Sequence, residues 1–217
     1  MAVISSAVGR VKPGRYEDFV SQALEASKLY ERLGAETPRL FSAGVAGEAF
    51  GTWTFSTEFP TMEAYGTFSD ALLADAEWQS FTMRLQDENS PSTIENVNTA
   101  VELPGRTSRG GRGPVNVVNV SRVNPGGLER SIELGVRACD FVEGQGALNA
   151  RSFDLVAAGM GAGMQMSIWE FENMRALGAC MDAWGSDPAG QAIAVDAAAA
   201  DAPLTRVFEG VYTQIPI

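Results

Sequence analysis

The sequence predicts an α+β protein built from two tandem β-α-β-β-α-β units of the ferredoxin-like type, and three observations support this. The chain has 217 residues, which is enough for one or two domains with a buried core. When the sequence is shifted by 112 residues it matches itself without gaps over about 80 positions. Each half also carries strand-like and helix-like apolar patterns in the same order.

The internal repeat is visible in short motifs. Arg-Val-Lys-Pro-Gly at residues 10–14 matches Arg-Val-Asn-Pro-Gly at 122–126, and Glu58-Phe59 matches Glu170-Phe171. Roughly 25 aligned positions are identical, far more than chance gives without gaps, so the chain is interpreted as a duplication. Gly- and Arg-rich composition predicts a flexible connector between the copies. The predicted organisation is a first unit at 1–103, a linker at 104–113 and a second unit at 114–217.

In the first unit, β-branched and small residues open the chain as a strand that Pro13-Gly14 ends. Apolar residues then recur every three or four positions from Tyr16 up to Gly34, a residue suited to a helix C-cap. Two strand-like runs and a second helix, expected to bend near residues 66–69, follow. The predicted elements are strand 3–11, helix 16–34, strands 38–46 and 49–58, helix 60–86 and strand 93–101.

The second unit repeats this order, with a helix break expected at Asp187-Pro188, because proline disfavours helix at the residue before it. Its predicted elements are strand 115–123, helix 126–143, strands 149–158 and 163–171, helix 172–200 and strand 205–215. One β-α-β-β-α-β unit leaves one face of its sheet bare. A second copy is the obvious cover, so we expect the two antiparallel sheets to face each other as a pseudo-twofold α+β barrel with the helices outside.

The amino-acid composition indicates which classes of binding partner and which cellular location the protein is expected to have. Acidic residues outnumber basic ones 27 to 16, which gives a net charge of −11 and disfavours nucleic acid and anionic membranes. No apolar stretch is long enough for a transmembrane helix, and the N-terminus is typical of a strand rather than a signal peptide. Cys139 and Cys180 do not form a CxxC motif, so buried free thiols are expected. A cytoplasmic protein is the simplest interpretation.

The sequence contains no histidine. This excludes a Ser-His-Asp triad, a Cys-His pair, a His-ligated zinc or iron site, and haem with an axial imidazole. No spacing of Asp and Glu suggests a carboxylate metal site. We therefore expect neither a metal nor another cofactor.

The motifs also carry a family resemblance. The chain resembles the dimeric α+β barrel superfamily, including antibiotic-biosynthesis monooxygenase-like and NIPSNAP-like domains, most closely in Glu-Phe-Glu-Asn-Met-Arg-Ala at 170–176 and Ser-Asp-Pro-Ala-Gly-Gln at 186–191. The resemblance covers nearly the whole chain, once per half. It implies a ligand held between each sheet and its own helices, and the superfamily includes cofactor-free oxygenases, lactone isomerases, polyketide cyclases and haem enzymes. The missing histidine argues against the haem enzymes and against cyclases with a histidine base.

Acids that are identical in both copies serve the shared fold or a shared site. Glu58 and Glu170 each end the third strand of their unit, where either a general base or a cap of the next helix is expected. Asp75, Asp187 and Glu143 lie in helical patterns, so we interpret them as caps or as part of solvated faces.

Two pairs of arginines are also repeated. Arg10 and Arg122 lie near the ends of the first strands, and Arg39 and Arg151 lie in the second strands. Each could bind a substrate carboxylate through two hydrogen bonds, with Arg122 as a candidate in catalysis. The alternative is a structural ion pair with the duplicated glutamates.

Residues found in only one copy are candidates for a specialised pocket, because an aromatic-lined cavity with a few polar groups is the usual form of a small-ligand site. Asp154 is a candidate general base whose pKa burial would raise. The alternative for the aromatic residues is that they fill the core. The candidates are Trp53, Tyr65 and Trp78 in the first unit, and Asn119, Asp154, Gln165 and Trp184 in the second.

These observations favour a small-molecule enzyme without metal or haem, of the cofactor-independent monooxygenase or isomerase/cyclase type. Its substrate would be a small aromatic, enol or lactone-like compound that supplies its own carbanion or enol, with protein groups stabilising the oxyanion. The alternative is a non-catalytic ligand-binding or protein-interaction domain. A homodimer through outer helices or strand edges is also possible.

Overall fold

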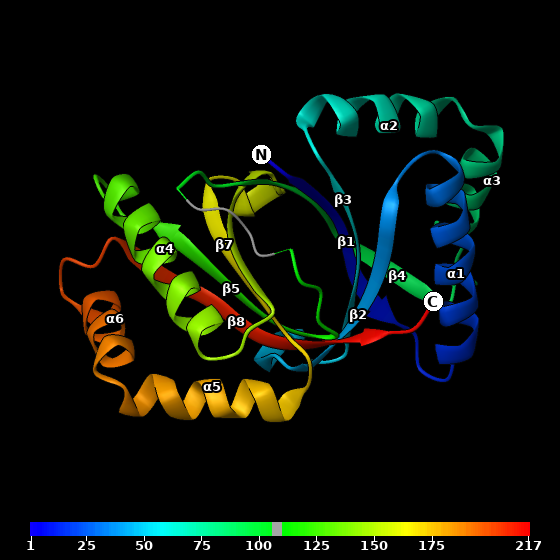
Figure 1. The fold of residues 1–217 in the computed structure, drawn as a ribbon. Coiled ribbons are helices and arrows are strands. Elements are labelled where there is room, and N and C mark those ends of the chain that lie inside the picture. The colour runs from blue at the N-terminus through cyan, green and yellow to red at the C-terminus, as the bar shows by residue number, and fades with distance from the viewer. Residues whose placement is uncertain (106–109) are drawn as a thin grey trace.

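The computed structural model describes residues 1–105 and 110–217 and shows the same order of elements in both halves (Figure 1). The first half consists of β1 (Val3–Val11), α1 (Tyr16–Arg32), β2 (Glu36–Val45), the short 3-10 helix η1 (Gly47–Ala49), β3 (Thr52–Phe59), α2 (Met62–Ala74), α3 (Ala76–Leu85) and β4 (Ser92–Glu102). The second half consists of β5 (Val115–Val123), α4 (Leu128–Gly144), β6 (Asn149–Ala157), η2 (Gly159–Gly161), β7 (Met164–Phe171), α5 (Met174–Ser186), α6 (Pro188–Ala198) and β8 (Leu204–Ile215).

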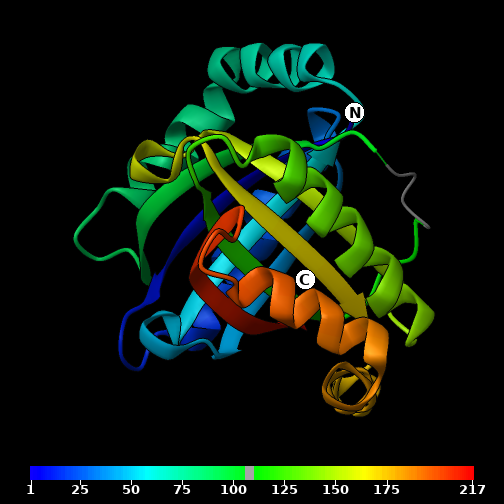
Figure 2. The same cartoon turned by 90° about the vertical axis from the view of Figure 1, so that its left-hand side faces the viewer.

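The eight strands form one closed barrel in the order β1-β3-β2-β8-β5-β7-β6-β4. Each half therefore supplies four neighbouring antiparallel strands, and the pairs β2–β8 and β4–β6 join the halves. The helices α1–α3 lie on one side of the barrel and α4–α6 on the opposite side (Figure 1). Figure 2 shows α4 and α6 laid across the outer face of the second half. None of the helices in the described ranges is long and apolar enough to cross a membrane.

Strand alternation gives the protein separate apolar layers inside and outside the barrel. Between the first-half strands and their helices, Phe19, Leu40 and Phe81 belong to one buried cluster. The corresponding layer of the second half is built around residues such as Val142 and Phe171, and it includes both cysteines, which are free and buried as predicted. A further cluster inside the barrel contains Ile4, Ala100, Phe153, Leu155 and Ala158.

The predicted elements are confirmed, but the expected bend at residues 66–69 is wrong. The break in the first half lies instead at Asp75, whose extended backbone (φ −83°, ψ 119°) separates α2 from α3. The Asp75 carboxylate accepts a hydrogen bond from the backbone N–H of Trp78 at 2.8 Å, so it caps α3. Asp187 caps α6 in the same way, through the N–H of Ala189 at 2.7 Å, at the break predicted there.

Glu143 is not on a solvated face, contrary to expectation. Its side chain is buried near the end of α4 and accepts a hydrogen bond from the backbone N–H of Ala150 at 2.8 Å. The carboxylate therefore attaches the start of β6 to α4, because a buried charge requires such a partner.

Candidate functional site

Four of the predicted site residues lie together inside the barrel. Arg39 Nη1 on β2 is 2.7 Å from Glu170 Oε2 on β7. Arg151 on β6 donates two hydrogen bonds, of 2.8 and 2.7 Å, to the carboxylate of Glu58 on β3. Both ion pairs join one half of the chain to the other. In the repeat, Arg39 corresponds to Arg151 and Glu58 to Glu170, so the two pairs are reciprocal. The expected ion pairs of these arginines with the duplicated glutamates are confirmed.

The end of the predicted linker belongs to the same network. Arg112 Nη2 is 2.6 Å from Glu58 Oε2, and its Nη1 is 3.0 Å from Glu170 Oε1. The backbone N–H of Gly113 donates to Glu170 at 3.1 Å, and the Gly113 carbonyl accepts from Arg39 at 2.5 Å. Residues 106–109 of the linker lie outside the described residues. The composition of 104–113 predicts only a flexible connector, so it does not identify Arg112 and Gly113 as part of this network.

Burial and pairing set the charge state of this network. The side chains of Glu170 and Arg151 are 1% and 5% exposed. Burial alone would raise the pKa of Glu58, but the hydrogen bonds and charges of Arg151 and Arg112 lower it below its ordinary value of 4.5. Glu58 is therefore ionised at neutral pH, with both oxygens engaged by arginine. Neither glutamate caps a helix, since Thr61 caps α2 and Asn173 caps α5.

Three other predicted residues, Trp53, Tyr65 and Trp78, lie around a cavity of about 340 Å³ between the first-half strands and helices α1–α3. We call it the aromatic cavity. No Asp, Glu, Lys or Arg is among its lining residues. Sequence reasoning missed most of its rings, which the periodicity indicates only as core. The aromatic lining residues are Phe19, Tyr30, Trp53, Phe55, Tyr65, Phe68, Trp78 and Phe81.

Tyr30 lies at the centre of this group. Its ring centroid is 5.0–5.3 Å from those of Phe55, Phe68 and Trp78. Burial, together with the charge that Tyr65 would carry, raises the pKa of Tyr30 to about 12. The Tyr65 hydroxyl in turn accepts a hydrogen bond from Thr99 Oγ1 at 3.2 Å. Tyr30 therefore keeps its phenolic proton at neutral pH and can act as a hydrogen-bond donor.

A buried polar atom in the same wall lacks a partner. The indole N–H of Trp53 is buried and has no hydrogen-bond acceptor within the described part of the chain. An unpaired buried donor costs free energy that a ligand acceptor would recover. The aromatic cavity therefore offers a mainly apolar space with an unpaired hydrogen-bond donor in its wall.

The second half is filled differently at the corresponding layer. Trp184, a predicted binding residue, stacks on Trp169 with ring centroids 5.4 Å apart, and its ring lies edge-on to Phe141 at 5.1 Å. At the position of Trp78 the second half has Gly190, where an added Cβ would lie 2.9 Å from Phe141. Trp184 therefore occupies packed core, which is the alternative that the sequence left open.

The remaining candidates of the second half lie on β5, β6 and β7. Asp154 pairs in register with Gln165 across β6 and β7, and burial raises the pKa of Asp154. Asn119 on β5 pairs with Ser167, and neither of its buried amide atoms has a hydrogen-bond partner in the described ranges. These three residues lie on the second-half strands, far along the chain from the aromatic cavity's lining.

The first-strand arginines lie apart from these groups. Arg10 is exposed and pairs with Glu95 at 2.9 Å rather than with a duplicated glutamate, because it lies at the opposite end of its strand from the network. Arg122 is exposed near the end of β5 and forms no ion pair with another described residue. Neither arginine lines the aromatic cavity.

Comparison with solved structures identifies the fold. An anthrone oxidase-like protein superposes with a TM-score of 0.61 at 15% identity, covering 99% of this chain and 91% of that one. A candidate monooxygenase from Fusobacterium nucleatum gives 0.63 at 10% identity, covering 99% and 93%. A chlorite dismutase from Candidatus Nitrospira defluvii gives 0.55 at 12% identity, covering 99% and 91%. The chain has the ferredoxin-like, dimeric α+β barrel fold of these proteins over its whole length, as the motif resemblance implied.

Sequence comparison adds no closer assignment. No protein-family model matches the chain, and no curated protein matches it in sequence. The comparisons therefore establish the fold, a closed α+β barrel, and no narrower class. The particular activity of the chain has to be argued from the site.

The donor set does not fit haem. The chain has no histidine, and both cysteines lie in the packed second half, away from the aromatic cavity. Tyr30 holds its proton too tightly to serve readily as a phenolate ligand, because its pKa is about 12. We therefore derive no step through haem.

Proposed function

We propose that this protein is a monooxygenase-like enzyme that works without metal or haem on a flat aromatic or enolisable substrate bound in the aromatic cavity. The observation that carries this proposal is the cavity itself, which is lined by eight aromatic residues and by no Asp, Glu, Lys or Arg. A volume of about 340 Å³ lies within the usual range for small-molecule sites. The anthrone oxidase-like neighbour supports a polycyclic aromatic ketone as the first substrate to test.

The chemistry follows from what the cavity can stabilise. A ketone with an acidic CH₂ group loses a proton to become an enolate, and the Tyr30 hydroxyl donates a hydrogen bond to the developing oxyanion. The enolate reacts with dioxygen, and overall CH₂ + O₂ gives C=O + H₂O. One oxygen atom enters the product, and the other leaves as water with both hydrogens. The same stabilisation of an enolate would serve an isomerase or a cyclase.

In this proposal the solvent, and not a carboxylate, accepts the proton that the substrate loses. Because Tyr30 stays protonated and no Asp or Glu lines the cavity, the substrate ionises by its own acidity and transfers its proton to solvent. We propose structural roles for Glu58 and Glu170, since arginines occupy their oxygens. Asp154, Arg122, Asn119 and Gln165 lie outside the cavity lining and have no part in this scheme.

We also propose that the chain is a tandem duplication, with units at 1–103 and 114–217 joined by 104–113, in which the first unit keeps the aromatic cavity between its strands and helices. The repeated order of elements and the equal strand order of the two halves support this. A cytoplasmic location, a homodimer, and the absence of nucleic-acid and membrane partners remain predictions from the composition.

Oxygen uptake with anthrone as the probe tests the function. The enzyme proposal expects uptake that saturates with anthrone, rises in proportion to protein, and consumes one O₂ per anthrone converted to anthraquinone. Trp78→Leu should weaken binding, because it removes a ring from the cavity wall. Saturable binding without oxygen uptake would instead favour the non-catalytic ligand-binding alternative, which the missing carboxylate also fits. Absence of both would contradict the assignment of this cavity.

A further inference from the structure

The barrel holds a second cavity, of about 500 Å³, between its first-half and second-half strands. We call it the lumen. Side chains alternate between the two faces of a strand, so on β3 Thr54 and Ser56 line the lumen while Trp53 and Phe55 line the aromatic cavity. The lumen therefore lies on the opposite face of the first-half strands, and Ser6 borders both cavities.

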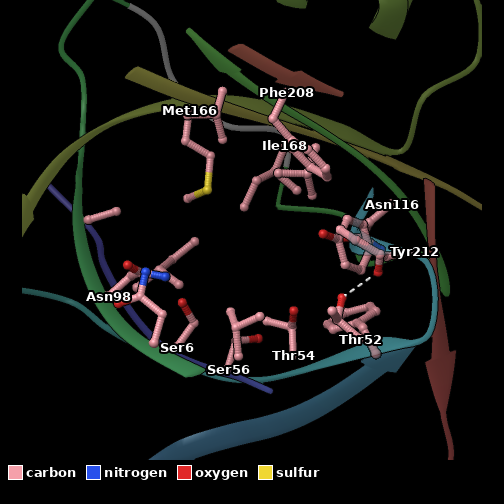
Figure 3. A pocket seen from close by; sticks show the side chains of 18 of the residues that line it. Ser6, Thr52, Thr54, Ser56, Asn98, Asn116, Met166, Ile168, Phe208 and Tyr212 are labelled. Carbon is pink, nitrogen blue, oxygen red and sulfur yellow. Dashed lines mark hydrogen bonds between the residues drawn. The ribbon is translucent and has the colours of Figure 1, made fainter. Parts of the chain in front are cut away.

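The two halves line the lumen with different chemistry at four pairs of equivalent positions, 112 residues apart. At these positions the first half has hydroxyl or amide groups and the second half has apolar side chains, whereas Asn116 and Tyr212 are polar residues of the second half that correspond to Ile4 and Ala100. Figure 3 shows Ser6, Thr54 and Ser56 on one side of the cavity and Met166, Ile168 and Phe208 on the opposite side, with Asn116 and Tyr212 between these two groups. The equivalent pairs are Ser6 and Val118, Thr54 and Met166, Ser56 and Ile168, and Asn96 and Phe208.

The polar wall has unused hydrogen-bonding capacity. Within the described ranges, the side chains of Ser6, Thr54, Ser56, Asn96 and Asn98 form no hydrogen bond with another residue. Hydroxyl and amide groups facing a cavity of this size bond to water when no ligand is present. Hydroxyl groups of a ligand can replace that water without loss of hydrogen bonds.

The two ends of the lumen indicate that the ligand is neutral. At the exposed mouth Arg10 pairs with Glu95 at 2.9 Å, and at the buried floor Arg151 pairs with Glu58 at 2.7 Å. An ionic ligand would have to compete with these ion pairs, whereas a neutral ligand leaves them intact. In the β1–β3 pair, Arg10 lies opposite Thr52 and Glu58 lies opposite Ile4, so the two charged residues are at opposite ends of these strands.

We propose that the lumen binds a neutral facial amphiphile, that is, a rigid alicyclic hydrocarbon with hydroxyl groups along one face. Its hydroxyl groups would contact the wall of Ser6, Thr54 and Ser56. Its hydrocarbon face would pack on the aliphatic part of the opposite wall, which includes Val118, Val120 and Ile168. This wall differs from the ring-lined aromatic cavity, so the two sites select different ligands. The lumen volume of about 500 Å³ lies within the usual range for sites that bind small molecules.

Methyl cholate, a neutral steroid ester with three hydroxyl groups on one face, is the probe that tests this proposal. Calorimetry gives its affinity, and the side-chain amide signals of ¹⁵N-labelled protein locate it. We expect saturable binding that shifts the signals of Asn98 and Asn116, which line the lumen, and leaves that of Asn119 unchanged. Methyl cholanate, the same ester without hydroxyl groups, should bind at least about tenfold more weakly.

Substitutions separate the lumen from other binding surfaces. Ser56→Ile introduces the residue that the second half has at position 168 and fills the lumen, so it should weaken binding at least about tenfold. Thr54→Val removes one hydroxyl group and should weaken binding about fivefold. Thr213→Val is the matched control, because Thr213 is an exposed strand threonine outside the lumen lining, and it should bind like the wild type.

Any one of four results would overturn the proposal. Methyl cholate could fail to saturate, methyl cholanate could bind equally well, or both lumen variants could keep wild-type affinity. Binding that shifts only the Asn119 signal would likewise place the ligand outside the lumen. None of these measurements involves turnover, so the outcome does not depend on oxygen uptake with anthrone.

Discussion

Arg151 and Glu58 form a two-bond ion pair, at 2.8 and 2.7 Å, although they are 93 residues apart and belong to different halves of the chain. The equivalent residues Arg39 and Glu170 form the reciprocal pair. The same arginine–glutamate contact therefore occurs twice between the two halves of the chain. A twofold interface between two identical subunits has the same reciprocal pattern. This network links the first-half strands to the second-half strands and lies at the buried end of the lumen.

The first prediction concerns the stability of this joint. Glu58→Gln removes the carboxylate that forms two hydrogen bonds with the buried Arg151 and leaves it only the longer contact with Glu170 at 3.5 Å, so the free energy of unfolding should fall by about 3 kcal/mol in a urea titration. Asp196→Asn is the matched control, because the pair of Arg137 and Asp196 is exposed at both ends. That control should change stability by less than about 1 kcal/mol. Equal effects of the two substitutions would show that the network contributes no more than a surface pair.

The second prediction is the pH dependence of the same contact. The pKa of Glu58 is lower in the folded protein than its ordinary value of 4.5. Its stabilising contribution is therefore complete above the unfolded-state pKa and is lost as the pH falls through the lower folded-state pKa. The difference in unfolding free energy between wild type and Glu58→Gln should be constant above about pH 5.5 and shrink below about pH 4. A difference that grows on acidification would contradict this sign.

The third prediction concerns the end of the linker. A Cβ added to Gly113 would lie 2.3 Å from the carbonyl oxygen of Phe171, so Gly113→Ala should destabilise the protein by about 2 kcal/mol or more. Gly44→Ala is the control, because an added Cβ there meets nothing within 4 Å. Thermal unfolding of both variants measures the difference. A wild-type melting temperature for Gly113→Ala would mean that this backbone is free to move.

The fold was largely predictable from the sequence. The repeat, the alternating apolar patterns and the Pro-Gly turns predict every strand, because each is a local or periodic signal. The break between α2 and α3 was misplaced because glycine and serine at 66–69 suggest a weak helix, whereas the deciding feature is the cap at Asp75. Capping depends on one side chain meeting one backbone N–H, and the equivalent Asp187 was recognised only because a proline follows it.

The sites were less predictable. Trp53, Tyr65 and Trp78 were found because the second half lacks them, and they do line one cavity. The lumen was missed because its wall residues alternate along the strands with core residues. Comparing only the inward positions of the two copies, such as Ser56 and Ile168, would have shown the polar and apolar walls. Arg112 could not be placed, since a Gly-rich segment carries no periodicity.

The fourth prediction concerns the pH dependence of turnover. Tyr30 with a pKa of about 12 stays protonated throughout the accessible range, whereas ionisation of the substrate becomes easier as the pH rises. The rate of oxygen uptake with anthrone should therefore increase between about pH 6 and pH 9 without a descending limb. A bell-shaped profile in that range would indicate a titrating acid on the protein and would remove Tyr30 from this role.

The most direct test of the central claim is the kcat for oxygen uptake with anthrone by Tyr30→Phe, compared with Tyr16→Phe. Both tyrosines are on α1, but Tyr16 is exposed and only Tyr30 lines the aromatic cavity. If the Tyr30 hydroxyl stabilises the enolate, its removal should lower kcat about 100-fold while Tyr16→Phe matches the wild type. Wild-type kcat in Tyr30→Phe would contradict the account of the aromatic cavity as the place where the reaction occurs.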